Sequence, residues 1–196
     1  VYVEGSGELI GAVRGLGTAH PTGYPLFCLS GRLLAALMPF ADPAYEINLV
    51  TALFSAATCG ALAHLLQLRG VSCWAALAAG LSLAFSRTFW SQAVIAEVYG
   101  QALLLVVLVL GQALAASERR TRRDVLLLGW LMGLGLTTHL LQVLIWPGIA
   151  VLFLWRWSSL WRSPRLLGQG VGAVAGGYSL IAYLLARNGR GSSFHW

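Results

Sequence analysis

The stretch EINLVTALFSAATCGALAHLLQL, residues 46–68, decides the class of fold. It has one acidic residue, at its start, and is otherwise a continuous apolar run. At a rise of ~1.5 Å per residue this run forms a helix about 35 Å long, which is enough to cross a bilayer. The pair Arg69-Gly70 ends the run. We therefore expect a membrane-spanning helix here.

Similar apolar segments make up most of the remaining chain. The sequence is 58% hydrophobic and only 10% charged, and its mean hydropathy is +0.73. This composition is typical of a multi-pass membrane protein and excludes an ordinary soluble domain. We expect an all-α, polytopic transmembrane helix bundle, with further apolar segments at 71–85, 91–116, 125–138, 140–155 and 166–186.

The chain before residue 46 is polar and rich in turn residues. Apolar residues recur with helical spacing over 6–16, where Ser6 is placed to cap the helix and Glu8 falls in its first turn. A turn at 20–25, fixed by Pro and Gly, precedes a short apolar run at 26–40. We expect three regions: an extracytoplasmic loop with a surface helix and a short apolar helix, then the helix bundle, then the start of a second extracytoplasmic loop, at residues 1–40, 41–186 and 187–196.

The connections between the apolar segments carry the arginines that indicate orientation. All 13 basic residues are Arg. When the segments are laid end to end, Arg69, the cluster at 119–123 and the turn at 155–165 fall on one side. The positive-inside rule makes that side cytoplasmic. The net charge of +6 therefore reflects membrane topology, so we expect the lipid bilayer as a partner and no nucleic acid. Three cysteines lack metal or disulfide spacing.

The other polar residues fall on the opposite, extracytoplasmic side. Each has an ordinary explanation: Glu46 as a helix-start charge, Glu97 as a satisfied buried acid, His139 as a capping side chain. Together they predict a polar site, whereas the lack of a repeat or of a broken helix pair argues against a secondary transporter. The set comprises five of the seven acids and three basic groups: Glu4, Glu8, Asp42, Glu46, Glu97, His20, His139 and Arg187.

Two glycine series predict close helix packing. Gly129-x-x-x-Gly133 and Gly168-x-x-x-Gly172-x-x-x-Gly176 each put small residues on one face of a helix. Backbones can approach closely at such faces. We therefore expect a packed bundle rather than isolated spans.

Several short motifs in this order resemble one family of membrane proteins. The chain is similar to polytopic proteins related to protein O-mannosyltransferases, in the GT-C superfamily of glycosyltransferases. The motifs are Gly5-Ser-Gly-Glu8, His20-Pro-Thr-Gly-Tyr-Pro-Leu-Phe27, Asn48, Phe89-Trp-Ser-Gln92, Glu97-Val-Tyr99 and Gly135-x-x-x-His139. The family commonly has Asp-Ser-Gly-Glu, whereas this chain has Gly5 in place of the Asp and Glu4 just before it.

The resemblance implies a function and a location. It implies an inverting transfer of a sugar, mannose among the candidates, from a polyprenyl-phosphate donor to the hydroxyl of a protein or other acceptor. The site would face the extracytoplasmic side of a cell membrane, for which we expect the bacterial inner membrane. It also implies that this chain is a piece of a longer protein and lacks the family's first and later helices. The alternative is a non-catalytic multi-pass transporter or partner-binding subunit.

The chemistry of such a transfer assigns roles to the polar residues. The attacking hydroxyl needs a carboxylate to take its proton, and either Glu8 or Glu4 is available. The departing phosphate needs nearby positive charge or hydrogen-bond donors. No Asp, Glu or His set with metal spacing appears within a segment, so we expect no metal and no cofactor. The substrate-binding candidates are His20, His139 and Arg187 for the phosphate, Tyr24, Trp90 and Tyr99 for the sugar or prenyl chain, and Glu97; membrane-interface anchoring is the simpler explanation for Trp90.

Overall fold

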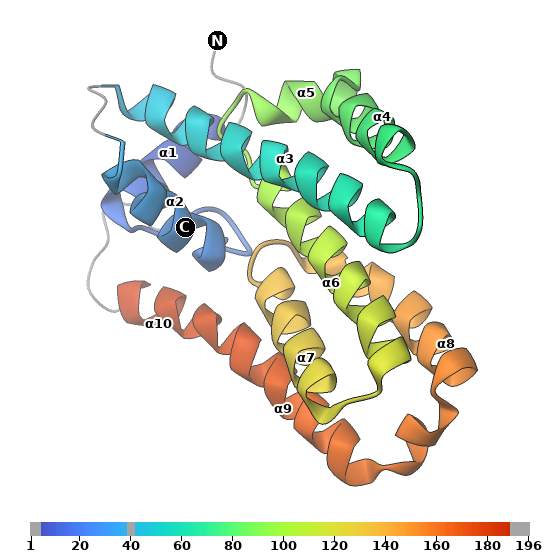
Figure 1. Cartoon of the computed structure of the whole chain (residues 1–196). Helices are drawn as coiled ribbons and strands as arrows, with labels where there is room; N and C mark the ends of the chain where they lie inside the picture. Colours follow the sequence, from blue (N-terminus) through green and yellow to red (C-terminus); the bar gives the residue numbers. More distant parts are fainter. Residues whose placement is uncertain (1–4, 39–41, 189–196) are drawn as a thin grey trace.

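The structure is a computed structural model that describes residues 5–38 and 42–188, and every regular element in that part is helical (Figure 1). This confirms the all-α fold. The elements are α1 Ser6–Gly15, α2 Pro25–Ala36, α3 Pro43–Leu68, α4 Cys73–Ala84, α5 Arg87–Ala93, α6 Tyr99–Arg119, α7 Arg122–Leu136, η1 Leu140–Ile145, α8 Trp146–Arg156, η2 Ser158–Arg162, α9 Pro164–Tyr178, η3 Ser179–Ile181 and α10 Ala182–Asn188.

Three helices in the described part are long and apolar enough to cross a membrane. They are Pro43–Leu68, Tyr99–Arg119 and Pro164–Arg187, the last made of α9, η3 and α10. Pro25–Ala36, Cys73–Ala84 and Leu140–Arg156 are shorter apolar helices. The helix expected at 46–68 is confirmed, and it begins earlier because Asp42 caps it and Pro43 occupies its first turn.

The span expected at 91–116 is interrupted, and part of the gap before it, residues 86–90, is helical. The helix α5 covers Arg87–Ala93, and the chain then leaves the helix until α6 begins at Tyr99. Thr51 on α3 explains the interruption. Its hydroxyl oxygen Oγ1 lies 3.3 Å from the backbone nitrogen of Glu97 and 3.4 Å from the backbone oxygen of Glu97. These contacts serve backbone groups that a continuous helix would have paired internally.

Two clusters of buried apolar side chains hold the helices together. One joins α1, α2 and α3 with the segment before α6, around Leu9, Val13, Phe27, Ile47 and Val98. The other joins α6, α7 and α8, around Val109, Leu128, Ile149, Phe153 and Trp157. The helix α3 also packs against α4 and α6.

The helices α7 and α9 pack closely side by side (Figure 1). A Cβ atom at Gly133 would lie 2.1 Å from the backbone oxygen of Val174, and one at Gly129 would lie 2.5 Å from that of Gly170. The prediction for α7 is therefore confirmed. The prediction for α9 is wrong, because a Cβ at Gly168, Gly172 or Gly176 would meet no atom of the described residues within 4 Å. The face of α9 that touches α7 carries Gly170, Ala173, Val174 and Gly177 instead.

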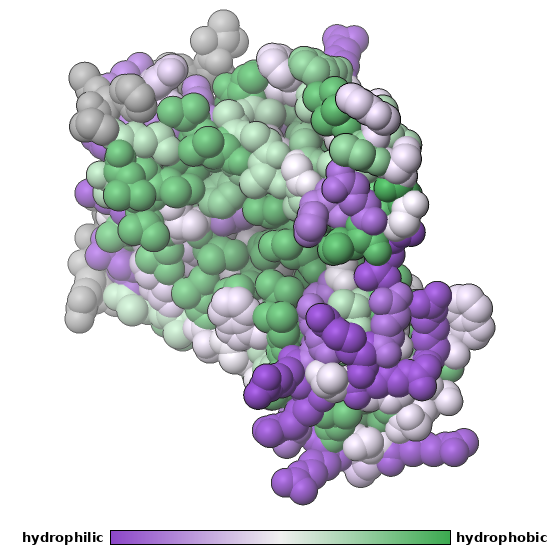
Figure 2. Space-filling model, in the orientation of Figure 1, coloured by the Kyte–Doolittle hydropathy of each residue, from purple (hydrophilic) through white to green (hydrophobic). Residues whose placement is uncertain are grey.

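The arginine-rich connections gather at one end of the molecule, where hydrophilic residues predominate in Figure 2. Glu118 accepts from Arg69 at 2.5 Å and from Arg156 at 3.4 Å. Arg119 pairs with Asp124 at 2.7 Å, and Arg120 donates to the backbone oxygen of Arg156. Connections distant in the sequence thus meet at one end, and the large apolar surface in Figure 2 lies on the rest of the molecule.

Candidate functional site

Glu8 and His20 form the centre of a polar cluster at the opposite end of the bundle. Glu8 lies in the first turn of α1, as predicted. One of its oxygens, Oε1, accepts from the backbone N–H of His20, and the other, Oε2, lies 3.0 Å from Nδ1 of His20. An ionised carboxylate only accepts hydrogen bonds, so this contact places a proton on Nδ1. Both oxygens of Glu8 therefore engage His20.

The start of α1 differs from the prediction in its cap. The capping position belongs to Gly5, at a φ of 96°, which has no side chain to cap the helix. Ser6 is the first helical residue, and its buried hydroxyl has no hydrogen-bond partner among the described residues. The capping role predicted for Ser6 is therefore wrong. A glycine suits position 5 because a side chain is strained at such a positive φ.

Aromatic rings connect His20 with two other parts of the chain. The Tyr24 hydroxyl lies 2.9 Å from Nε2 of His20. The Tyr24 ring stacks on His139 at a centroid distance of 6.5 Å, and His139 lies 5.7 Å from Tyr99. His139 also caps η1, since Nδ1 accepts from the backbone N–H of Leu141 at 3.2 Å. The capping role considered for His139 is thus confirmed, and its ring joins the cluster as well.

Glu97 completes the cluster from the segment between α5 and α6. A Cβ at Gly5 would lie 3.9 Å from Oε1 of Glu97, so the start of α1 is close to this carboxylate. Burial raises the pKa of Glu97, and the Val98 backbone N–H and His20 partly oppose that rise. Burial also raises the pKa of Tyr24, reinforced by Tyr99, Glu97 and Glu8, and lowers the pKa of His139. These shifts follow from the cost of charging a desolvated group.

An open pocket of about 790 Å³ lies against this cluster. Its mouth and walls come from the end of α4, from α5, from α6 and from η1. Its polar lining includes Glu97, Tyr99 and His139. The apolar lining includes Leu83, Phe89, Ile95, Leu103, Val106 and Leu141. Such a pocket combines a polar edge with enough apolar wall to hold a ligand that has both parts.

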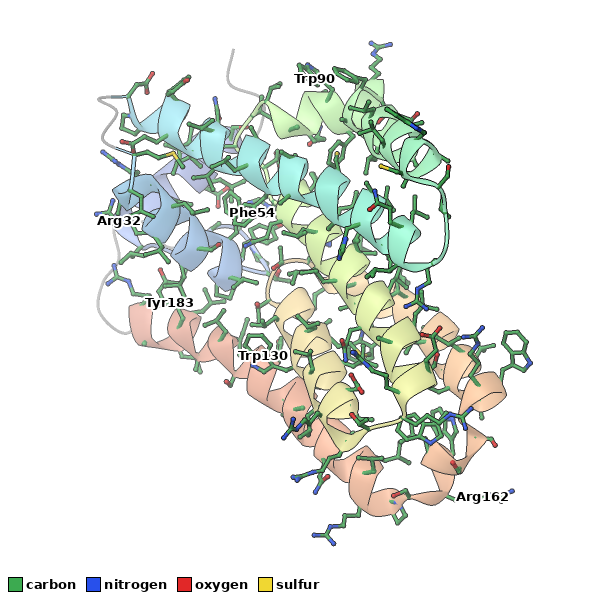
Figure 3. All side chains as sticks on the ribbon, viewed as in Figure 1. Arg32, Phe54, Trp90, Trp130, Arg162 and Tyr183 are labelled. Atoms are coloured by element: carbon green, nitrogen blue, oxygen red, sulfur yellow. The ribbon has the colours of Figure 1, made fainter. Side chains whose placement is uncertain are left out.

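Two predicted site residues lie elsewhere. Trp90 does not line the pocket; it is 51% exposed and stacks on Phe85 at 5.8 Å, on the outer side of α5 (Figure 3). Arg187 donates to the backbone oxygen of Gly15 at 3.1 Å, beside Tyr183, whose hydroxyl donates to the backbone oxygen of Leu16 at 2.5 Å. Arg187 therefore binds the C-terminal end of α1.

Three other acids of the predicted polar face are accounted for as follows. Asp42 accepts from the backbone N–H of Ala44 at 2.8 Å and so caps α3. Glu46 is buried and pairs with Arg14 at 2.5 Å. Glu4 lies outside the described residues.

Several pocket residues were not predicted as site residues. Phe89 and Gln92 line the pocket from α5, and Gln142 lines it from η1. Gln142 donates to the backbone oxygen of Ala102 at 2.9 Å, and a Cβ at Gly135 would come within 2.4 Å of its Oε1. The motifs Phe89-Trp-Ser-Gln92 and Gly135-x-x-x-His139 contained a usable signal, because Gly135 makes room for Gln142. Among the described residues, no group of three or more His, Cys, Asp or Glu side chains could hold a metal ion.

The sequence matches a family model and a curated relative. Residues 5–162 match the model described as Protein O-mannosyl-transferase TMEM260 N-terminal domain. A mouse protein named Protein O-mannosyl-transferase TMEM260 is 41% identical over 121 residues, which is 58% of this chain and 17% of the mouse protein. The match thus spans less than a fifth of that relative's length. No solved structure matches the chain significantly.

Proposed function

The chain belongs to the family of the Protein O-mannosyl-transferase TMEM260 N-terminal domain, and from this premise we propose that it is part of a membrane glycosyltransferase. The proposed reaction transfers a sugar, with mannose the first candidate, from a polyprenyl-phosphate donor to a protein hydroxyl. The observation that carries the proposal is the meeting of Glu8, His20, Tyr24, Glu97, Tyr99 and His139, drawn from four separate parts of the chain, beside one pocket.

The two kinds of pocket lining suit the two parts of a lipid-linked sugar. Apolar walls suit a prenyl chain, because they replace the hydrocarbon around it in the bilayer with side chains of the same polarity. Tyr99 and His139 offer flat faces and hydrogen-bonding groups at the polar edge. A sugar-phosphate headgroup would therefore lie beside these two side chains, with the prenyl chain along the apolar wall.

The proposed displacement inverts the configuration at the sugar C1. The acceptor oxygen attacks C1, the bond from C1 to the phosphate oxygen breaks, and its electron pair leaves with the phosphate. A carboxylate takes the hydroxyl proton. The Nε2–H of His139 can donate toward the developing phosphate charge, because Nδ1 of that ring accepts from Leu141. His20 could do so only by giving up its contact with Glu8 or Tyr24.

Some of the predicted roles have weaker structural support. The base role assigned to Glu8 and Glu4 and the phosphate-binding role assigned to Arg187 stay predictions. Both Glu8 oxygens bind His20, so a substrate hydroxyl would compete with His20 for them. Arg187 donates to the backbone oxygen of Gly15. It would therefore have to bind the phosphate of the sugar donor in addition to this contact or in place of it.

We place the site on the extracytoplasmic face, by the arginine distribution and the positive-inside rule. Residues 1–40 and 187–196 are proposed to lie on that same side, with 41–186 forming the bundle. The acceptor is a protein or other hydroxyl compound, and no metal or cofactor is expected.

The test uses the full-length parent protein in lipid nanodiscs. It is incubated with labelled polyprenyl-phosphate mannose or glucose and a mixed Ser/Thr peptide acceptor. We expect label on the peptide, in the configuration opposite to that of the donor, as read by digestion with anomer-specific glycosidases. His139→Ala should strongly reduce transfer, whereas Trp90→Ala, outside the pocket, should leave it nearly unchanged.

Two results would contradict the proposal. Transfer from a nucleotide sugar but from no polyprenyl-phosphate sugar would exclude the donor class. No transfer at all, together with solute uptake driven by an ion gradient into sealed vesicles, would favour the transporter.

A further inference from the structure

We propose that Glu97, and not Glu8, accepts the proton of the acceptor hydroxyl, and that Glu8 acts as a positioning residue through His20. This inference rests on the proposed glycosyl transfer and names the group that serves as its base. It begins from the bonding of each carboxylate at this end of the bundle.

The other described acids at this end are already engaged. Asp42 caps α3. Glu46 is 2% exposed and pairs with Arg14. Glu8 binds the backbone N–H and the ring of His20 with its two oxygens. Of these four described acids, Glu97 alone lines the pocket.

The chain holds Glu97 in place by its backbone. The buried hydroxyl of Thr51 lies within 3.3 Å of the backbone nitrogen and 3.4 Å of the backbone oxygen of the same residue. Thr51 is fully buried on α3, so its own position is fixed by packing. These contacts fix the main chain of Glu97, and therefore the point beside the pocket from which its side chain extends.

The carboxylate of Glu97 lies beside Gly5 at the start of α1. Position 5 has no side chain, and a Cβ there would already lie 3.9 Å from Oε1 of Glu97. A longer side chain at position 5 would therefore lie against the carboxylate. The positive φ of Gly5 also makes a side chain unfavourable there.

The electrostatic surroundings suit a base. The titratable groups around Glu97 are His20 and Tyr24 of the connection to α2, Tyr99 of α6 and His139 at the start of η1. Glu8 of α1 is bonded to His20. Burial raises the pKa of Glu97, and the Val98 N–H and His20 limit the rise. A carboxylate with a raised pKa binds a proton more strongly, which favours proton transfer as long as it is ionised at the working pH.

The step balances as follows. The acceptor oxygen forms a bond to the sugar C1 as its proton moves to a carboxylate oxygen of Glu97. The bond between C1 and the phosphate oxygen breaks, and polyprenyl phosphate leaves as the anion. Glu8 keeps the ring of His20 oriented through its contact with Nδ1.

The experiment compares four variants of the full-length parent in nanodiscs: Glu97→Gln, Glu97→Asp, Glu97→Ala and Glu8→Gln. Initial rates with polyprenyl-phosphate mannose and a Ser/Thr peptide are measured from pH 5 to pH 8. Since the base must be ionised, the wild-type kcat should fall as the pH falls through the raised pKa of Glu97. Glu97→Gln should lower kcat by about 10²- to 10⁴-fold, as lost acid–base assistance does, leave the KM for donor nearly unchanged and abolish this acid limb.

The other variants distinguish the residue that accepts the proton from the residues beside it. Glu97→Asp should retain the acid limb at a lower kcat. Glu8→Gln should lower kcat less than Glu97→Gln does, and its kcat should still fall at low pH as in the wild type. Added formate should partly restore the rate of Glu97→Ala, because a small carboxylate can occupy the vacated space.

The outcomes distinguish the inference from the function on which it rests. An active wild type with an unchanged kcat and acid limb in Glu97→Gln would overturn the inference alone. Loss of the limb in Glu8→Gln but not in Glu97→Gln would return the base role to Glu8. A wild type that transfers no sugar would overturn the proposed function, and the inference with it. If Glu97→Gln fails to fold, Glu97→Asp and the formate response of Glu97→Ala decide the question.

Discussion

Arg14 and Glu46 show how differently two partners of one ion pair can be situated. The side chain of Glu46 is 3% exposed and that of Arg14 is 38% exposed, at an oxygen-to-nitrogen distance of 2.5 Å. The pair joins α1 to α3, and therefore fixes α1 against the long helix. A buried carboxylate depends on its partner more than a half-exposed guanidinium does, because only the carboxylate lacks water as an alternative.

This difference predicts that removing Arg14 alone costs more stability than removing both partners. Arg14→Met should lower the free energy of unfolding by about 3 kcal/mol, since an uncompensated buried charge remains. Arg14→Met combined with Glu46→Gln should cost less than Arg14→Met alone. Denaturant unfolding of the full-length parent in mixed micelles measures both, with Arg162→Met at the far end of the molecule (Figure 3) as the control. Equal costs for the single and double variants would show that Glu46 is solvated despite its burial.

The contact between α7 and α9 depends on which face of each helix carries the small residues. A Cβ at Gly133 would meet backbone atoms of Val174 and Tyr178, and a Cβ at Gly177 would lie 2.2 Å from the backbone oxygen of Trp130. Backbone atoms cannot rotate away as side chains do, so the two helices must separate if either glycine acquires a Cβ. The contact thus needs glycine at these positions.

Gly133→Ala should therefore destabilise the protein, and Gly172→Ala should not. Forcing a methyl group into this contact should cost about 1–3 kcal/mol, as overpacking typically does. A Cβ at Gly172 of α9 would meet no atom of the described residues within 4 Å. The same substitution there changes only the helix propensity, which is higher for Ala than for Gly. Thermal unfolding of the two variants side by side measures the difference. A smaller loss of stability for Gly133→Ala than for Gly172→Ala would contradict this packing.

A second contact between elements ties α10 to α1. Tyr183 and Arg187 both donate to backbone oxygens at the end of α1, where the last carbonyls of a helix have no internal partner. The positive charge of Arg187 also suits the negative end of the α1 dipole. The last apolar helix therefore supports the helix that carries Glu8.

At the scale of the whole molecule, the polar side chains divide between two ends. Glu8, His20, Glu97 and His139 gather at one end, and Arg69, Glu118 and Arg156 at the other. The helices α3, α6 and α7 run between these ends. Each end is thus built from connections that are far apart in the sequence.

The division predicts opposite accessibility for labels on the two ends. In a parent with its native cysteines replaced by serine, Arg123→Cys should react with an impermeant maleimide only in inverted vesicles. Gly15→Cys, at an exposed position with open space at its Cβ, should react only in right-side-out vesicles or intact cells. Reaction of both positions from the same side would contradict the proposed topology.

The sequence by itself determined the helical class, the long helices at 46–68 and 166–186, and the arginine clusters at the connections between helices. These features are local, because the length of an apolar run and the residues at its ends are set by neighbours in the chain. The helix at 46–68 and the position of Glu8 in the first turn of α1 were predictable for this reason.

Only the tertiary structure decided which side chains meet. Thr51 interrupts the helix at Glu97 from 46 residues away, and the face of α9 that touches α7 depends on the rotation of both helices about their axes. Trp90 and Phe89 are neighbours in sequence, yet Phe89 lines the pocket and Trp90 stacks outside it. Adjacent residues on a helix point about 100° apart, so the orientation of α5 against its neighbours, and not the composition of the motif, selects the residue that reaches the site.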